Sequence, residues 1–160
     1  MIYLILKVLH ILSVIAFLGN ITTGLFWKAR ADRTRDPRLI AHTLEAIIAS
    51  DRWFTIPGVI GIVGFGIGAA VVGGLPLLHT GWVLWALVLF TLSGVAFMAQ
   101  VVPLQRRMAK LARQAAGDSP MDWNEYHQLS RRWHLWGGVA LALPALVAVL
   151  MVIKPHLPSL

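Results

Sequence analysis

Four long apolar segments constrain the fold of this chain more than any other feature of its sequence. They cover residues 2–26, 53–78, 81–104 and 135–153. A helix rises about 1.5 Å per residue, so each segment has roughly the length needed to cross ~30 Å of hydrocarbon. Lipid offers the backbone no hydrogen-bond partners, which favours helices. The sequence therefore predicts an all-α, four-span transmembrane bundle of antiparallel helices.

The composition agrees with this fold class and leaves no room for a second domain. Of the 160 residues, 58% are hydrophobic and 13% are charged, which is too apolar for an ordinary soluble protein. We expect residues 1–160 to form a single integral membrane domain in contact with the lipid bilayer. Cysteine is absent, which excludes disulfides, thiolate metal sites and cysteine nucleophiles.

The basic residues predict the topology. Twelve of the 14 Lys and Arg residues lie between the first and second spans or between the third and fourth, and only Lys7 and Lys154 lie elsewhere. By the positive-inside rule both basic segments face the cytoplasm, so the N- and C-termini face outward. Topology and contact with anionic headgroups account for the net charge of +7, so we predict no nucleic-acid partner.

A short helix is predicted within each basic segment. In residues 38–50, Ile40, Leu44 and Ile47 share one helical face, which predicts an amphipathic helix lying on the inner membrane surface. The second helix begins after Asp122, an acidic helix cap, and leads into the fourth span. We therefore expect short interfacial helices in the cytoplasmic loops.

The second span is rich in glycine. Gly64 and Gly68 repeat a spacing that lets helix backbones approach closely, so we interpret the glycines as sites of helix packing. The alternative is that they leave room for a flat ligand such as a porphyrin or a quinone. The tight connection at residues 73–76, which contains two glycines and a proline, predicts that the second and third spans pack as antiparallel neighbours.

One stripe of the first span carries nearly all of its polar groups. Polar side chains avoid lipid, so this stripe is expected to face the bundle interior. Lys7 lies one turn nearer the outside, and its long side chain can extend to the outer interface. The members of the stripe, at helical spacing, are His10, Ser13, Phe17, Asn20 and Gly24.

His10 is the main functional candidate, because an ionisable side chain about 12 Å deep in the membrane is costly. Imidazole is an axial ligand of haem iron, and a helical bundle can hold the macrocycle. We therefore predict haem b as the cofactor, with His10 as the metal ligand. The alternative is a neutral His10 that is hydrogen-bonded to a hydroxyl or an amide. The predicted cofactor-binding residues are His10, Lys7, His79, Ser13 and Asn20.

The opening helix resembles two known membrane families. Lys7-Val-Leu-His10-Ile-Leu, followed by Ala16-Phe-Leu-Gly19, is similar to the first helix of HemJ-type protoporphyrinogen oxidases and of copper-resistance D membrane proteins. In HemJ proteins the corresponding histidine binds haem, and the resemblance implies this role for His10. HemJ proteins also have a functional lysine on a later span, whereas residues 53–104 contain none, so oxidase activity does not follow.

A second resemblance extends over the full length. The segments that carry it are Phe17-Leu-Gly-Asn20, Phe26-Trp-Lys28, Ala31-Asp-Arg33, Asp51-x-x-Phe54-Thr55-x-Pro57-Gly58 and Leu150-Met-Val-Ile-Lys-Pro155. In these segments the chain resembles a bacterial family of small predicted integral membrane proteins, classed as a domain of unknown function. The resemblance implies a multi-pass protein of the bacterial inner membrane and names no reaction.

Three further polar residues fall near the cytoplasmic ends of the first two spans. Asn20, Asp51 and Thr55 can form a polar cluster with Lys28 or Arg52. The alternative is that Ser50 or Asp51 caps the second span and pairs locally.

Three functions are compatible with these sequence patterns. The patterns do not decide whether the protein is an enzyme. The leading hypothesis is a haem- or quinone-associated redox protein centred on His10. The second is a non-enzymatic accessory or assembly protein that acts through helix–helix contacts with further copies or with other membrane proteins. The third, a small-solute or metal transporter, is less favoured because the later spans contain few polar residues. We identify no catalytic residue.

Overall fold

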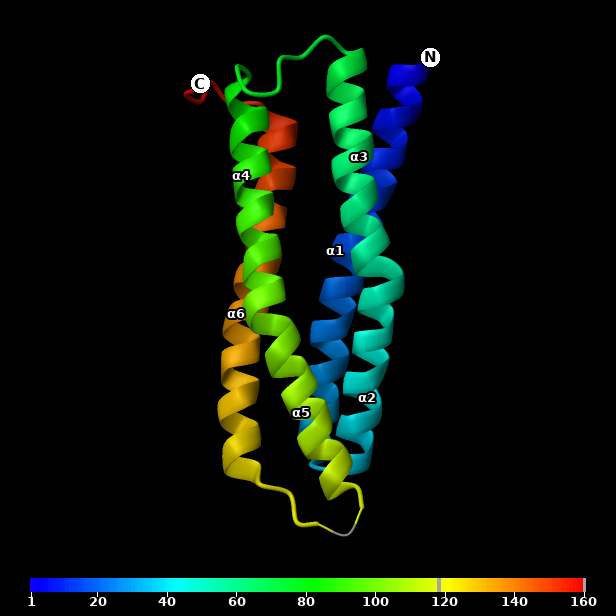
Figure 1. Ribbon diagram of the computed structural model, residues 1–160, viewed down its shortest axis with the longest axis vertical. Coiled ribbons are helices and arrows are strands. Elements are labelled where there is room, and N and C mark those ends of the chain that lie inside the picture. Colours follow the sequence, from blue (N-terminus) through cyan, green and yellow to red (C-terminus); the bar gives the residue numbers. More distant parts are fainter. Residues whose placement is uncertain (118, 160) are drawn as a thin grey trace.

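The computed structural model describes residues 1–117 and 119–159, which form a bundle of long helices (Figure 1). Four of its helical rods are long and apolar enough to cross a membrane, which confirms the predicted fold class. In chain order the elements are α1 (Ile2–Thr34), α2 (Pro37–Ser50), the π-helical turn η1 (Asp51–Thr55), α3 (Ile56–Val72), α4 (Gly81–Ala96), the π-helical turn η2 (Phe97–Val101), α5 (Val102–Ala115) and α6 (Trp123–Ile153).

The helices are longer than the membrane is thick. The 33 residues of α1 extend about 50 Å, so the last two turns, from about residue 27 onward, lie beyond the hydrocarbon. The first turns of α6 extend in the same way, on the side that carries the basic segments. Both termini lie at the opposite end of the bundle (Figure 1). As in other membrane proteins, large apolar side chains such as Trp53 remain exposed, in contact with lipid.

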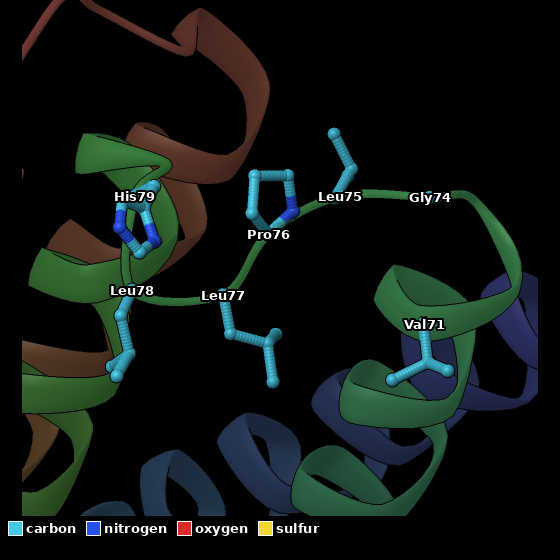
Figure 2. Close-up of a pocket in the computed structure, with 7 residues that line it drawn as sticks. All are labelled: Val71, Gly74, Leu75, Pro76, Leu77, Leu78 and His79. Carbon is cyan, nitrogen blue, oxygen red and sulfur yellow. The ribbon is translucent and has the colours of Figure 1, made fainter.

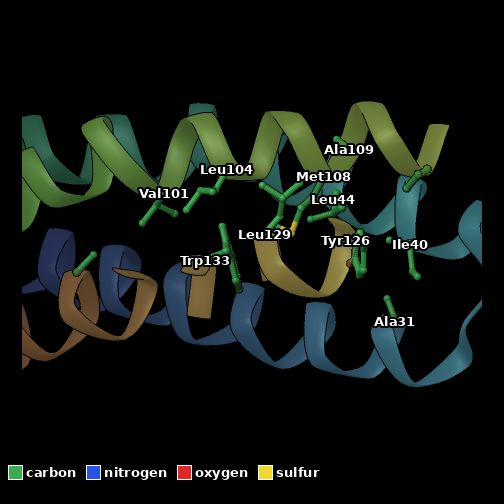
Figure 3. Close-up of a cluster of buried hydrophobic side chains, with 13 residues drawn as sticks. Ala31, Ile40, Leu44, Val101, Leu104, Met108, Ala109, Tyr126, Leu129 and Trp133 are labelled. Carbon is green, nitrogen blue, oxygen red and sulfur yellow. The ribbon is translucent and has the colours of Figure 1, made fainter. Parts of the chain in front are cut away.

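The helix predicted at residues 38–50 is present, but it does not lie flat on the membrane. Asp36 caps α2, and Pro37 occupies its first turn. The predicted apolar face is buried, but it packs on α5, and α2 continues through η1 into α3 as one rod. The reason is that α5 offers a second apolar face at the same level. Together with α1 and α6 they enclose a core of buried side chains (Figure 3).

The π-helical turns occur where a proline interrupts the backbone hydrogen bonds of the helix. Pro57 and Pro103 each follow a π-turn by two residues. Proline has no N–H, so the carbonyls of Trp53 and Ala99 lose their usual partners, and the helix widens locally instead of ending. Asp51 therefore lies inside a continuous helix. The expectation that it caps the second span is corrected.

On the side of the termini, the helices separate into two pairs. There α1 packs along α3, and α4 packs along α6. Within the described residues α3 and α4 have no pair of Cα atoms within 8 Å, which corrects the prediction that the second and third spans are packed neighbours. The helix α3 also ends at Val72, before the predicted limit of its span. The rings of Phe17 and Phe90 connect the two pairs, with their centroids 5.7 Å apart.

A single buried hydroxyl compensates for the proline inside α6. Pro144 cannot donate to the carbonyl of Ala140, and the hydroxyl of Ser93 on α4 donates to that oxygen at 2.8 Å instead. This bond joins α4 to α6 in the membrane, where an unpaired carbonyl has no water to bind.

We expect Ser93→Ala to lower the stability of the protein by about 1 kcal/mol, because it leaves the carbonyl of Ala140 without a donor. The measurement is thermal unfolding of the purified protein in detergent. In a Pro144→Ala background the restored N–H satisfies the same carbonyl, and Ser93→Ala should have little further effect. An equal loss in both backgrounds would contradict this account.

Candidate functional site

The polar stripe of α1 faces the bundle, as predicted, and lies against the glycines of α3. An added Cβ on Gly58 would lie 3.1 Å from the Cβ of Phe17, and one on Gly61 would collide with the hydroxyl of Ser13. Gly64, in contrast, is exposed and has no atom within 4 Å of such a Cβ among the described residues. Gly58 and Gly61 therefore allow α1 to pack closely against α3, as predicted from the glycine content of the second span. Gly64 does not contribute to this packing.

His10 is held by α3 through one hydrogen bond. Its Nδ1 lies 2.8 Å from the carbonyl oxygen of Ile62. A Cβ at Gly66, four residues further on, would lie 2.9 Å from the same nitrogen, so the missing side chain makes room for the imidazole. A carbonyl can only accept, so Nδ1 carries the proton and the Nε2 of a neutral imidazole keeps its lone pair. Nε2 has no hydrogen-bond partner in the described part of the chain and is not among its fully buried atoms, so it reaches the surface of the bundle.

Among the described residues, none of the others predicted to accompany His10 forms a hydrogen bond with it. Ser13 donates to the carbonyl of Leu9 in its own helix, and Lys7 is exposed. His79 is exposed at the end of the loop between α3 and α4, beside an open apolar recess of about 570 Å³ (Figure 2). Asn20 belongs to a second polar cluster, nearer the end of the bundle that carries the basic segments.

That second cluster is centred on Asp51. The Oδ1 of Asp51 accepts hydrogen bonds from the Thr55 hydroxyl at 2.9 Å and from the Asn20 amide at 3.3 Å. Its Oδ2 accepts one from the Gln105 amide of α5 at 3.0 Å. The predicted cluster of Asn20, Asp51 and Thr55 is therefore confirmed. Its further partner is Gln105, not Lys28 or Arg52.

A small cavity adjoins this cluster. Its volume is about 20 Å³, enough for a single water molecule, and Asn20, Asp51 and Gln105 are among the residues that line it. Trp133 of α6 also lines it and donates its indole N–H to the Gln105 side-chain oxygen at 3.1 Å. The cluster thus connects all the rods that meet at this level.

A third cluster surrounds Lys28, beyond the hydrocarbon. Lys28 is fully buried, and its ammonium donates to Asp32 at 2.6 Å and to Ser130 of α6 at 2.7 Å. Tyr126 donates to the other oxygen of Asp32 at 2.6 Å. The ammonium also lies 5.1 Å from the centre of the Trp133 ring, which places Trp133 between this cluster and that of Asp51.

The burial of this cluster changes the ionisation of its members. Burial lowers the pKa of Lys28, and the charge and the hydrogen bond of Asp32 act in the opposite direction. Burial raises the pKa of Tyr126, and Asp32 adds to the increase. The Tyr126 hydroxyl therefore stays protonated at physiological pH, as its role as a donor to Asp32 requires.

The partners on α5 and α6 were not predicted from the sequence. Gln105, Tyr126, Ser130 and Trp133 carry no motif that separates them from residues at a membrane interface. Periodicity contains a weak signal, because Tyr126, Ser130 and Trp133 share one face of a helix. This shared face indicates a binding partner for Lys28 and Asp32 only when α1 is known to pack against it.

The comparison with known proteins agrees with the fold. The family described as predicted integral membrane protein (DUF2269) matches residues 4–155. This match confirms the full-length resemblance to a membrane family of unknown function. No curated protein and no solved structure matches the chain.

Proposed function

The chain belongs to the DUF2269 family of predicted integral membrane proteins, and because this description names no activity, we propose a function from the geometry around His10. The proposed function is that of a membrane redox protein that binds haem b, with His10 as an axial ligand.

One observation carries this proposal. The Nδ1 of His10 donates to the carbonyl of Ile62, which leaves the lone pair of Nε2 without a partner among the described residues. In lipid an unpaired polar atom costs free energy, so Nε2 favours an added ligand. Histidines that bind metals commonly donate their second nitrogen to a backbone carbonyl, which fixes the ring and its tautomer. The iron of haem can accept this lone pair as a ligand, and the largely apolar macrocycle is compatible with a site in lipid.

The surroundings of His10 suit a haem in two further respects. The side chains near it on α1 and α3 are almost all aliphatic, which excludes water from the cofactor. Lys7 is exposed one turn nearer the outer end, where its ammonium can pair with a propionate. Bound haem would supply one-electron transfer, while His10 and Ile62 would hold its iron in a fixed orientation.

We place the protein in the bacterial cytoplasmic membrane with both termini outside. The support is the charge distribution, because the basic residues are concentrated on the ends of α1, α2, α5 and α6 that lie opposite the termini. By the positive-inside rule that end is cytoplasmic. His10 then lies in the outer half of the membrane.

The test is an absorption spectrum of the detergent-purified protein from haem-replete cells, oxidised in air and then reduced with dithionite. We expect a Soret band that sharpens on reduction. His10→Gly should remove the band, and added imidazole should restore it, because the free ligand fills the space that the side chain left. Ser13→Ala is the matched control, since Ser13 lies on the same stripe but bonds only to its own helix.

Two results would overturn the proposal. One is a colourless wild-type protein that also fails to bind added hemin. The other is a band that persists in His10→Gly. A colourless protein that copurifies in fixed proportion with another membrane protein would favour the accessory function instead.

A further inference from the structure

Asp51 has a single unoccupied position for a hydrogen bond. A carboxylate offers about four lone pairs, two on each oxygen. Thr55 and Asn20 occupy both positions on Oδ1, and Gln105 occupies one of the two on Oδ2. The second lone pair of Oδ2 has no donor among the described residues.

All direct partners of this carboxylate are neutral. From α1 it meets Asn20, from its own rod Thr55, and from α5 Gln105. Trp133 of α6 stands behind Gln105. The nearest charged residue along the chain, Arg52, is exposed, and the Lys28–Asp32 pair lies on the other side of Trp133. Within the described residues no cation neutralises Asp51.

We infer that Asp51 is a proton-exchange site, served by the water-sized cavity that it lines. In the exchange a hydronium ion transfers its proton to Oδ2 and leaves as water, so the carboxylate becomes a neutral carboxylic acid; release reverses the step. One vacant lone pair accepts one proton, whereas a metal ion requires several oxygen ligands. The adjacent cavity has room for one water molecule, which can relay the proton and then accept a hydrogen bond from the new hydroxyl.

The exchange has a structural consequence for the bundle. Asp51 receives donors from α1 and from α5, so its charge strengthens the bonds that join these helices to the α2–α3 rod. Protonation weakens those bonds without breaking them. The site therefore couples proton uptake to the packing of three rods. This inference does not depend on haem binding at His10.

The experiment is infrared spectroscopy of the full-length protein in lipid, titrated in pH and repeated in D₂O. We expect the carbonyl stretch of one protonated carboxyl group per chain, shifted in D₂O, at pH values where ordinary solvent-exposed carboxyl groups are ionised. Asp51→Asn should abolish the band and still fold, because the amide resembles the neutral acid. Asp122→Asn is the matched control, because Asp122 is exposed and asparagine can still cap α6, and it should leave the band unchanged.

Three results would overturn the inference. They are the absence of such a band in the wild-type protein, its persistence in Asp51→Asn, and its removal at constant pH by sodium ions. The last result would show that a metal ion displaces the proton, so that the site is a cation site and not one that exchanges protons alone. The wild-type titration alone decides the first and third results, even if Asp51→Asn fails to fold.

Discussion

Replacing Lys28 with methionine is expected to destabilise the protein by about 3–5 kcal/mol, because the change leaves the Asp32 carboxylate without its cation in a largely buried cluster. Lys28 is fully buried, and its ammonium contacts Asp32, Ser130 and the Trp133 ring. Methionine preserves most of the volume of the side chain, so the loss reports on the charge. The measurement is chemical or thermal unfolding in detergent.

The protein contains a matched control for this experiment. Arg113 on α5 pairs with Glu45 on α2, but the side chains are 71% and 43% exposed. Arg113→Met should therefore cost less than about 1 kcal/mol. Combining Lys28→Met with Asp32→Asn should recover much of the lost stability, because no unpaired charge remains. A loss for Lys28→Met no larger than that for Arg113→Met would contradict the structural role of the pair.

Replacing Gly66 with alanine is expected to disturb His10 selectively. The added Cβ would lie 2.9 Å from Nδ1 and 3.0 Å from Cε1 of the imidazole, so the ring must move and its bond to Ile62 is lost. If His10 binds haem, the affinity should fall about 10–100-fold, as it does when a metal-binding histidine loses its supporting hydrogen bond.

Gly64→Ala is the control on the same helix. Its Cβ would enter open space, so haem content should not change, and stability should rise by up to about 1 kcal/mol through the higher helix propensity of alanine. The measurements are haem per chain, from absorbance, and thermal unfolding. Equal behaviour of the two variants would show that Gly66 does not shape the His10 site. The unfolding data test this point even if no haem binds.

The sequence predicted much of the site on α1 and η1. His10 and Asn20 lie on one stripe of the first span, and this stripe faces the interior because lipid excludes polar groups. Asn20, Asp51 and Thr55 were predicted to meet, since they share one membrane depth. Gln105 and Trp133 were not, because their positions depend on how α5 and α6 pack against the other rods, and no local pattern encodes this.

The sequence by itself determined the fold class, the number of spans and the concentration of basic residues at one end of the bundle. These properties follow from the solvent, since a bilayer requires long apolar helices and distributes basic residues to one side. Only the tertiary structure decided that α2 extends α3 instead of lying on the membrane, and that α3 and α4 do not touch. Both results depend on which apolar helix faces lie at the same level along the bundle and can pack together. Hydrophobic burial is non-directional, so the sequence of one helix does not determine which other helix covers its apolar face.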